Sequence, residues 1–186
     1  MITGTLMKSI AVYCGASNGA KPIYADAARQ LARALVDHNI ALVYGGGKVG
    51  LMGVIADEVL RLGGEATGVI PRALVEREVG HAGLTRLFVV KDMHERKAMM
   101  ADLSEGFIAM PGGFGTLEEL FEMVTWAQLG IHAKPIGLLN TEGFYDGLVA
   151  FARHQQEEGF VRPAHAALMN IDADAEALVR KLLDVA

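Results

Sequence analysis

The segment from Pro111 to Glu119 reads Pro-Gly-Gly-Phe-Gly-Thr-Leu-Glu-Glu and follows an apolar run at residues 107–110. Glycines let a backbone turn sharply and approach a ligand closely, and the free N–H groups at the start of the next helix bind anions. A phosphate group is the natural ligand of such a turn. A carboxylate one helical turn further on adds little to anion binding, so we expect it to act on a neighbouring part of the ligand. The pattern therefore predicts a phosphorylated substrate with chemistry beside its phosphate.

Helical geometry selects Glu119 among the acidic residues of this segment. At about 100° per residue, a buried stripe is expected to form from Leu117, Leu120, Val124 and Ala127. Glu118 and Glu122 then face away from the stripe, whereas Glu119 lies at its border beside Met123. The alternative for Thr116 and Glu119 is a capping box, in which the carboxylate reaches back to the Thr116 N–H. For this pair taken alone, capping is the more common arrangement.

Arg96 is the basic residue that best fits such a site. It follows Asp92 and Glu95, which fit a helix cap, and it falls in the middle of an apolar stripe formed by Met93, Met99, Met100 and Leu103. A buried guanidinium without a partner is costly, so Arg96 either pairs with a carboxylate inside the protein or points into a ligand cleft. Glu119 and a ligand phosphate are the candidate partners. Lys97 flanks the same stripe and could contact a phosphate, although a solvated lysine is the commoner outcome.

Two further glycine-bearing turns follow apolar runs, at residues 14–17 and 44–53. Residues 45–50 formally match the dinucleotide pattern G-x-G-x-x-G, but the acidic residue expected after the next strand is replaced by Pro71 and Arg72. A phosphate loop of the Walker type also fails, because Val49 follows Lys48 where Ser or Thr is needed. The remaining interpretation is a tight turn that approaches a nucleotide-like ligand.

Short apolar runs alternate with helical patterns along the chain. We expect strands at residues 9–14, 40–44, 66–70, 85–90, 106–110 and 136–139, and helices at residues 23–38, 50–62, 93–103, 116–129, 145–158, 163–169 and 174–185. The long segment 71–84 is expected to be irregular, with one short helix. This alternation predicts an α/β fold: a Rossmann-like, doubly wound parallel sheet flanked by helices in three layers. All three glycine turns then meet at the carboxyl edge of the sheet, where ligands bind.

Composition favours one globular domain over residues 1–186, with residues 1–7 as a loose N-terminal extension. Hydrophobic residues make up 52% of the 186 residues and charged residues 21%, which is sufficient for a large core. The net charge of -5 argues against DNA or RNA as a partner. Neither a leader peptide nor an apolar run of membrane-spanning length is apparent, and Cys14 is the single cysteine, so we expect a cytoplasmic protein without a membrane partner.

Cys14 is expected to pack in the core rather than act as a nucleophile, because it ends an apolar strand. The six histidines lack the spacing of metal ligands, so no metal site is expected. Trp126 and Gln128 lie off the buried stripe of their helix, and an exposed Trp in polar surroundings is typical of a subunit contact. A homodimer is the expected assembly.

Together these segments resemble the LONELY GUY family, the cytokinin riboside 5'-monophosphate phosphoribohydrolases that have often been mislabelled lysine decarboxylases. The family pattern Pro-Gly-Gly-x-Gly-Thr-x-x-Glu is matched in full at residues 111–119, and Val-Tyr-Gly-Gly-Gly-x-x-Gly-Leu-Met-Gly is matched at residues 43–53. Met-His-Glu-Arg-Lys at 93–97 and Thr-Trp-Ala-Gln-Leu-Gly-Ile-His at 125–132 also match. One departure is Ala16, where relatives often have Ser, which leaves Ser17 alone to offer a hydroxyl to the phosphate.

The resemblance implies hydrolysis of the N-glycosidic bond of an adenosine-type 5'-monophosphate, plain or prenylated on the base, to the free base and ribose 5-phosphate. It implies that Arg96 and Glu119 are catalytic and that no metal or organic cofactor is needed. It further implies a nucleotide-binding set of Ser17, Gly46, Gly47, Met52, Glu78, Met93, Lys97, Gly112, Gly113, Phe114, Gly115, Thr116, Leu117, Glu118 and Thr125. By its own sequence, a loop of alternating charges, Glu78 indicates only a solvated surface.

Two other functions remain open. Related folds resemble molybdenum-cofactor carrier proteins, so a non-catalytic carrier of a nucleotide or of that cofactor is the main alternative. A nicotinamide-dependent oxidoreductase is weakened by the missing ribose-binding acid. Decarboxylation of lysine would need a Schiff-base lysine and a cofactor site, and neither is apparent in the sequence.

Overall fold

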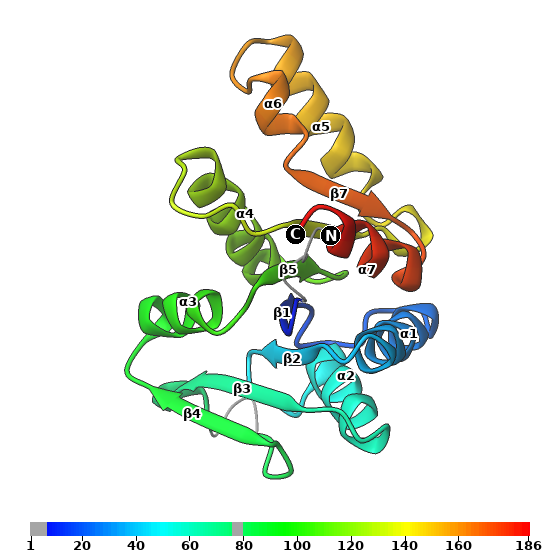
Figure 1. Ribbon diagram of the computed structural model, residues 1–186, viewed down its shortest axis with the longest axis vertical. Coiled ribbons are helices and arrows are strands. Elements are labelled where there is room, and N and C mark those ends of the chain that lie inside the picture. Colours follow the sequence, from blue (N-terminus) through cyan, green and yellow to red (C-terminus); the bar gives the residue numbers. More distant parts are fainter. Residues whose placement is uncertain (1–6, 76–79) are drawn as a thin grey trace, which may run out of the picture.

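The computed structural model describes residues 7–75 and 80–186. Its strands are β1 (Ser9–Tyr13), β2 (Ala41–Tyr44), β3 (Ala66–Pro71), β4 (Arg86–Val90), β5 (Gly106–Ala109), β6 (Ile136–Leu139) and β7 (Met169–Asp172) (Figure 1). The helices are α1 (Ile23–Asp37), α2 (Gly50–Arg61), α3 (Met93–Asp102), α4 (Phe114–Gln128), α5 (Asp146–Glu157), α6 (Pro163–Ala166) and α7 (Ala175–Asp184). Single 3-10 turns lie at Arg72–Leu74 and Thr141–Gly143.

All seven strands form one parallel sheet in the order β4-β3-β2-β1-β5-β6-β7. The order of the strands reverses between β1 and β5, which pair from Ile10 with Gly106 to Tyr13 with Ala109. In doubly wound sheets this reversal opens a crevice outside the carboxyl ends of the two strands, and ligands bind there. The Rossmann-like fold predicted from the sequence is confirmed, and its strand-order reversal lies between β1 and β5.

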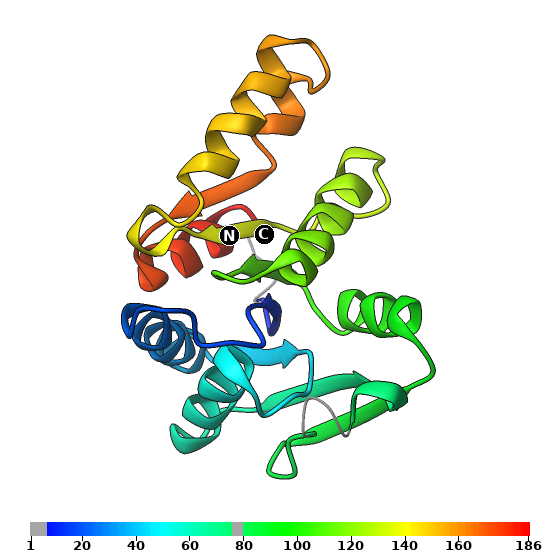
Figure 2. The same cartoon turned by 180° about the vertical axis from the view of Figure 1, so that it is seen from behind.

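Helices cover both faces of the sheet, as the opposite views in Figures 1 and 2 show. One apolar cluster joins β1 and β2 to α1, α2 and α7, and a second joins β1 and β5 to α3, α4 and the start of α5. Large side chains such as Leu31, Leu35, Ile55 and Phe107 are fully buried in these clusters. The remaining part of α5 and α6 extends away from the sheet. This arrangement makes β1 and β5 a rigid base for the turns that follow them.

The main element that the sequence pattern does not predict is β7. The expected helix at residues 163–169 is only α6, Pro163–Ala166, and Met169 instead begins a strand that pairs with β6. The strand Met-Asn-Ile-Asp is short, half-buried and paired on one side only, so its sequence lacks the continuous apolar run of a central strand.

The N-terminal extension expected at residues 1–7 falls mostly outside the described residues. Its last residue, Met7, is buried and lies against Gly106 at the start of β5. Within residues 7–75 and 80–186, we find no helix that has both the length and the apolar character needed to cross a membrane.

Candidate active site

Two glycine turns meet at the carboxyl ends of β1 and β5. The Gly15 N–H donates a hydrogen bond of 3.1 Å to the Pro111 carbonyl oxygen, which joins the two turns directly. A Cβ atom on Gly112 would lie 2.1 Å from Thr116 Oγ1 and 2.9 Å from the Gly15 nitrogen, so no side chain fits at position 112. These glycines thus allow a close contact between two backbones at the strand-order reversal, and their approach to a ligand stays a prediction.

The helix after the second turn begins earlier than expected. Gly113 is the N-cap of α4, no side chain caps this end, and the first helical bond runs from the Leu117 N–H to the Gly113 carbonyl. Thr116 therefore lies inside the first turn and is buried, so the capping-box interpretation of Thr116 and Glu119 is wrong. The N–H groups of a first helical turn have no partner within the helix, and they attract anions. The start of α4 fits the phosphate site that the glycine pattern predicts.

Arg96 lies on α3, whose start is fixed by the predicted cap: Asp92 Oδ1 accepts hydrogen bonds from the His94 and Glu95 N–H groups. The Arg96 side chain is buried, with only 5% of its surface exposed. Its Nε donates to the Val69 carbonyl at 3.1 Å and its Nη2 to the Gly45 carbonyl at 2.9 Å. These main-chain acceptors hold the guanidinium at the carboxyl ends of β2 and β3.

The glycine turn after β2 is shaped to accept this guanidinium. A Cβ atom on Gly45 would lie 2.0 Å from Arg96 Nη2, and Gly46 has a positive φ of 77°. The Gly46 carbonyl accepts a 3.0 Å hydrogen bond from the His81 N–H. The imidazole of this buried histidine accepts from the Gly83 N–H at Nδ1 and contacts Asp57 through Nε2 at 2.8 Å. No local sequence pattern predicts that His81 fixes this turn.

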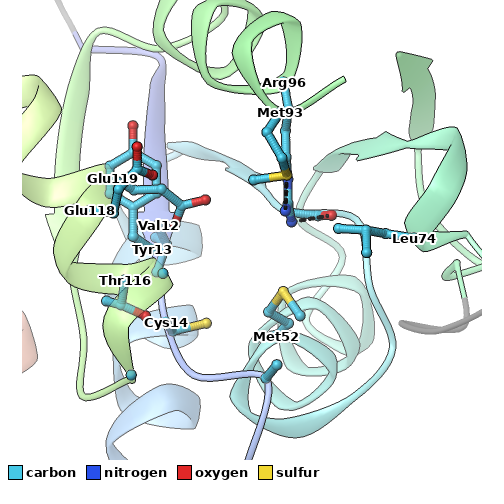
Figure 3. Close-up of a pocket in the computed structure, with 14 residues that line it drawn as sticks. Val12, Tyr13, Cys14, Met52, Leu74, Met93, Arg96, Thr116, Glu118 and Glu119 are labelled. Atoms are coloured by element: carbon cyan, nitrogen blue, oxygen red, sulfur yellow. Dashed lines mark hydrogen bonds between the residues drawn. The ribbon is translucent and has the colours of Figure 1, made fainter. Parts of the chain in front are cut away.

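A pocket of about 280 Å³, the central pocket, lies between these elements. Figure 3 shows Arg96 and Met93 on one side of it and Glu118 and Glu119 on the opposite side, with Met52 between α2 and the cavity. Predicted site residues that line it are Met52, Met93, Arg96, Gly113, Gly115, Thr116, Glu118 and Glu119. A permanently charged guanidinium and a half-buried carboxylate thus line one cavity from separate helices.

Six lining residues are not among the individually predicted site residues: Val12, Tyr13, Cys14, Ala16, Gly45 and Leu74. Most of them end β1 or follow a strand, so their position at the carboxyl edge of the sheet was the available signal. Burial raises the pKa of the Cys14 thiol, Glu119 raises it further and Arg96 opposes this effect. A thiol kept protonated is a poor nucleophile, and its membership of an apolar cluster agrees with the predicted packing role.

A second pocket of about 380 Å³, the adjacent pocket, shares Ala16 and Gly113 with the central pocket. Ser17 and Gly112, both predicted site residues, line it. Its other walls include the apolar side chains of Tyr24, Leu51, Pro111 and Phe144. The β1 turn therefore separates a charged cavity from a more apolar one.

Other predicted site residues lie outside both pockets. Gly46 packs against β3 and Gly47 forms a bridge with Gly80, while Leu117 is half-buried against the core. Phe114 and Thr125 are exposed on α4, and Glu78 falls outside the described residues. The binding roles of these residues stay predictions.

Lys97 is not the solvated lysine that its sequence favours. Its side chain is 8% exposed, and its ammonium contacts the carboxylates of Glu118 and Glu122 on α4. Burial alone would lower the pKa of Lys97, but the contacts with the two carboxylates outweigh it and raise the pKa. Lys97 therefore remains charged.

The structure also corrects the expectation of an exposed Trp on α4. Trp126 is half-buried and packs against the cluster that includes Phe107 and Leu120. The apolar side chains that α4 and its following turn expose are instead Phe114, Phe121, Leu129 and Ile131. Over the described ranges 7–75 and 80–186, we find no group of three or more His, Cys, Asp or Glu residues that could hold a metal ion.

Comparison with known proteins adds sequence relatives that match almost the whole chain. A family described as "Possible lysine decarboxylase" matches residues 52–182. The chain is 51% identical over 177 residues to the cytokinin riboside 5'-monophosphate phosphoribohydrolase LOG1 of Arabidopsis thaliana. This alignment covers 95% of the present chain and 83% of LOG1. The chain is 47% identical over 182 residues to the probable cytokinin riboside 5'-monophosphate phosphoribohydrolase LOGL2 of Oryza sativa subsp. japonica, with 98% and 75% covered.

Solved structures with a similar fold are more distant in sequence. The molybdenum cofactor binding protein of Rippkaea orientalis aligns with a TM-score of 0.71 at 19% identity, over 96% of each chain. The Moco carrier protein of Chlamydomonas reinhardtii aligns with a TM-score of 0.70 at 21% identity, over 95% of this chain and 98% of that one. At such identities the likeness shows a shared fold, and function must be argued from the site.

Proposed function

The chain belongs to the LONELY GUY (LOG) family of cytokinin riboside 5'-monophosphate phosphoribohydrolases, and we propose that it hydrolyses the N-glycosidic bond of an adenosine-type 5'-monophosphate. The products are the free base, adenine or its N6-prenylated form, and ribose 5-phosphate. The observation that supports this proposal is the meeting of Arg96 and Glu119 in one pocket beside the first turn of α4. The reaction needs a carboxylate near the sugar and an anion site for its phosphate, and this pocket offers both.

Glu119 has the chemistry that the bond cleavage requires. Positive charge develops on the ribose as its bond to the base breaks, and a nearby carboxylate stabilises that charge electrostatically. The same carboxylate can orient or deprotonate the attacking water. Because Glu119 is half-buried at the edge of the central pocket, its charge acts in a medium less polar than bulk water.

Arg96 positions the substrate and the Glu119 carboxylate in this proposal. Its hydrogen bonds to Gly45 and Val69 fix the guanidinium before a ligand arrives, so little ordering is needed on binding. The 5'-phosphate binds at Gly113, Gly115 and Thr116 in the first turn of α4, where the helix dipole favours an anion. Phosphate binding then holds the reacting bond in place, so a nucleoside without the phosphate should react poorly.

Incubation with AMP and with N6-isopentenyl-AMP, followed by chromatography, tests the proposal. We expect free base and ribose 5-phosphate in equal amounts, and the ratio of the two rates gives the preferred base. Glu119→Gln and Arg96→Met should lose the release, whereas Glu158→Gln, a change of an exposed carboxylate at the end of α5, should retain it. A protein that binds nucleotide but releases no base would instead be a carrier, and the proposal would be wrong.

We further propose that the enzyme is a cytoplasmic homodimer. The exposed side chains of Phe114, Phe121, Leu129 and Ile131 give α4 and its following turn an apolar surface that a second copy can cover. The single cysteine, Cys14, is buried and forms no disulfide, as is usual for proteins of a reducing compartment. Light scattering should give twice the mass of the 19.9 kDa chain, and a monomer at micromolar concentration would contradict the dimer.

A further inference from the structure

The Lys97 ammonium is a buried charge whose partners lie on a different helix. Its side chain is 8% exposed, and the structure places it against Glu118 Oε1 and within 3.0 Å of Glu122 Oε2. Removing one partner of a buried ion pair leaves the other charge uncompensated, which is costly. Glu118 and Glu122 are four residues apart and therefore lie on one face of α4. Lys97 thus joins α3 to two successive turns of α4.

The Lys97–Glu118 ion pair lies one residue away from each proposed catalytic side chain. Lys97 directly follows Arg96 on α3, and Glu118 directly precedes Glu119 on α4. Arg96 and Glu119 face the central pocket from its opposite sides (Figure 3), and Glu118 lines the same pocket. The distance across the pocket is therefore set by how α3 and α4 are joined, and Lys97 is an ionic link between them at this level.

Three carboxylates of α4 also act electrostatically on the end of β1. Burial raises the pKa of the Tyr13 hydroxyl well above its ordinary value, and Glu119, Glu122 and Glu118 each raise it further. Glu118 and Glu119 line the central pocket together with Tyr13. Glu118 and Glu122 are like charges four residues apart on α4, and such a pair destabilises a helix unless a cation lies beside it.

We propose that Lys97 is a positioning residue, which fixes the separation of Arg96 and Glu119 by joining α3 to α4 through Glu118 and Glu122. The inference rests on the proposed function and differs from the substrate contact that the family resemblance implies for this lysine. Lys97 is absent from the residues that line the central pocket, and its ammonium is already paired with two carboxylates. It acts through the helices rather than on the phosphate.

Steady-state kinetics of four variants test this role: Lys97→Met, Lys97→Arg, Glu122→Gln and the Lys97→Met/Glu122→Gln double variant. A misplacement of about 1 Å can reduce a rate by about 100-fold, so Lys97→Met should lower kcat by about 10- to 100-fold. The KM for AMP should change much less. Lys97→Arg should restore most of kcat, because arginine keeps the charge and can bridge two carboxylates. Glu122→Gln should lower kcat less in the Lys97→Met background than in the wild type, because the two side chains act as a unit.

A phosphate contact by Lys97 would give a different pattern and would overturn the inference. Lys97→Met would then raise the KM for AMP with kcat retained, leave slow adenosine turnover unchanged, and show additivity with Glu122→Gln. A merely structural role would lower the melting temperature with kcat unchanged, which also contradicts it. If Lys97→Met does not fold, Glu122→Gln decides alone: we expect a several-fold loss of kcat, and an unchanged kcat overturns the inference.

Lys134→Met is the matched control. Its ammonium donates a 2.7 Å hydrogen bond to the Ala101 carbonyl near the end of α3, away from both pockets. This change should lower the melting temperature but leave kcat unchanged. A wild-type protein that releases no base would overturn the proposed function and this inference together. Release by the wild type, with kcat unaffected in the Lys97 variants, would overturn this inference alone.

Discussion

At the scale of single residues, the proposed chemistry depends on one carboxylate and one guanidinium held on separate helices. The guanidinium of Arg96 is fixed by two main-chain carbonyls, and the carboxylate of Glu119 lies at the border of the buried face of α4. Both side chains are placed by main-chain elements before any substrate binds. Preorganised charge of this kind is usually the largest contribution to catalysis.

Glu119→Gln should lower kcat for base release by about 100- to 1000-fold, the loss typical of removing one preorganised electrostatic group. The amide keeps the shape of the side chain but cannot stabilise a positive charge on the ribose. The melting temperature should stay within about 2 °C of the wild type, because the side chain is only half-buried and most such changes have small effects on stability. Kinetics and thermal melting of the same preparation check both expectations. An unchanged kcat would contradict the assignment of Glu119.

Gly45→Ala should reduce activity through Arg96. The new Cβ would lie 2.0 Å from Arg96 Nη2 and 3.0 Å from Met52 Sδ, so the guanidinium must move. We expect a loss of kcat/KM of about 100-fold, as for other small displacements of a catalytic group. Gly147→Ala is the control, because its Cβ would meet no atom within 4 Å on α5. That variant should keep its activity, and equal activity of Gly45→Ala would show that the position of Arg96 is unimportant.

Single residues also mark the limit of what the sequence could predict. Glu119 and Arg96 were identifiable because glycine turns and helical periodicity are local patterns. The sequence of Lys97 left a phosphate contact and a solvated side chain open, and neither predicts its ion pairs with Glu118 and Glu122, which depend on the packing of two helices. The position of Tyr13 in the central pocket follows from the arrangement of the sheet and not from a local sequence pattern.

At the scale of elements, the position of α4 matters most, because its first turn and Glu119 both face the central pocket. Its far end is joined to the segment before β6 by His132, whose Nε2 lies 2.9 Å from the Met123 carbonyl. The Nδ1 of this histidine accepts from the Lys134 N–H, so the ring is neutral and Nε2 donates. The neutral form of His132 therefore stabilises the end of α4.

Stability should fall with acidification through His132. Burial lowers its pKa below the ordinary 6.5, the hydrogen bond to Met123 opposes this, and the charge of Lys134 lowers the pKa further. The unfolded chain then binds a proton more readily than the folded protein, so His132 reduces the free energy of unfolding as pH drops below about 6.5. Urea denaturation between pH 8 and pH 5.5 should show a smaller loss for His132→Gln than for the wild type. An equal loss in the two proteins would contradict this role.

Most elements were predictable because their apolar runs or helical spacing are continuous. The exceptions have physical reasons: β7 is an edge strand without a buried run, and the start of α4 is set by Gly113 rather than by a side-chain cap. The Thr116–Glu119 pair has the composition of a cap but lies one turn too late in the helix. The helix begins instead at the glycine turn, beside the hydrogen bond that joins the turns after β1 and β5.

At the scale of the whole molecule, the site lies where the strand order reverses, between β1 and β5. The two halves of the sheet meet there, and their glycine turns are joined by the bond from Gly15 to Pro111. Three turns that are far apart in the sequence thus surround one cavity. The parallel topology could be predicted from the alternation of strands and helices, and it implied this meeting point.

Ribose 5-phosphate should stabilise the whole fold, because it binds between the two halves only when they are assembled. A ligand present at 100 times its dissociation constant adds about 2.7 kcal/mol to the free energy of unfolding. For a chain of this size, such a gain corresponds to a rise in melting temperature of about 5 to 10 °C. Thermal melting in millimolar ribose 5-phosphate checks this, with ribose as the control. Equal melting temperatures in both sugars would contradict a phosphate site at α4.

A crystal structure of the Glu119→Gln variant with bound AMP tests the central claim most directly. We predict that the phosphate contacts the N–H groups at the start of α4 and that the anomeric carbon lies within about 4 Å of the side chain at position 119, the reach of a reacting group. A nucleotide whose base–ribose bond lies away from that side chain and from Arg96 would contradict the account.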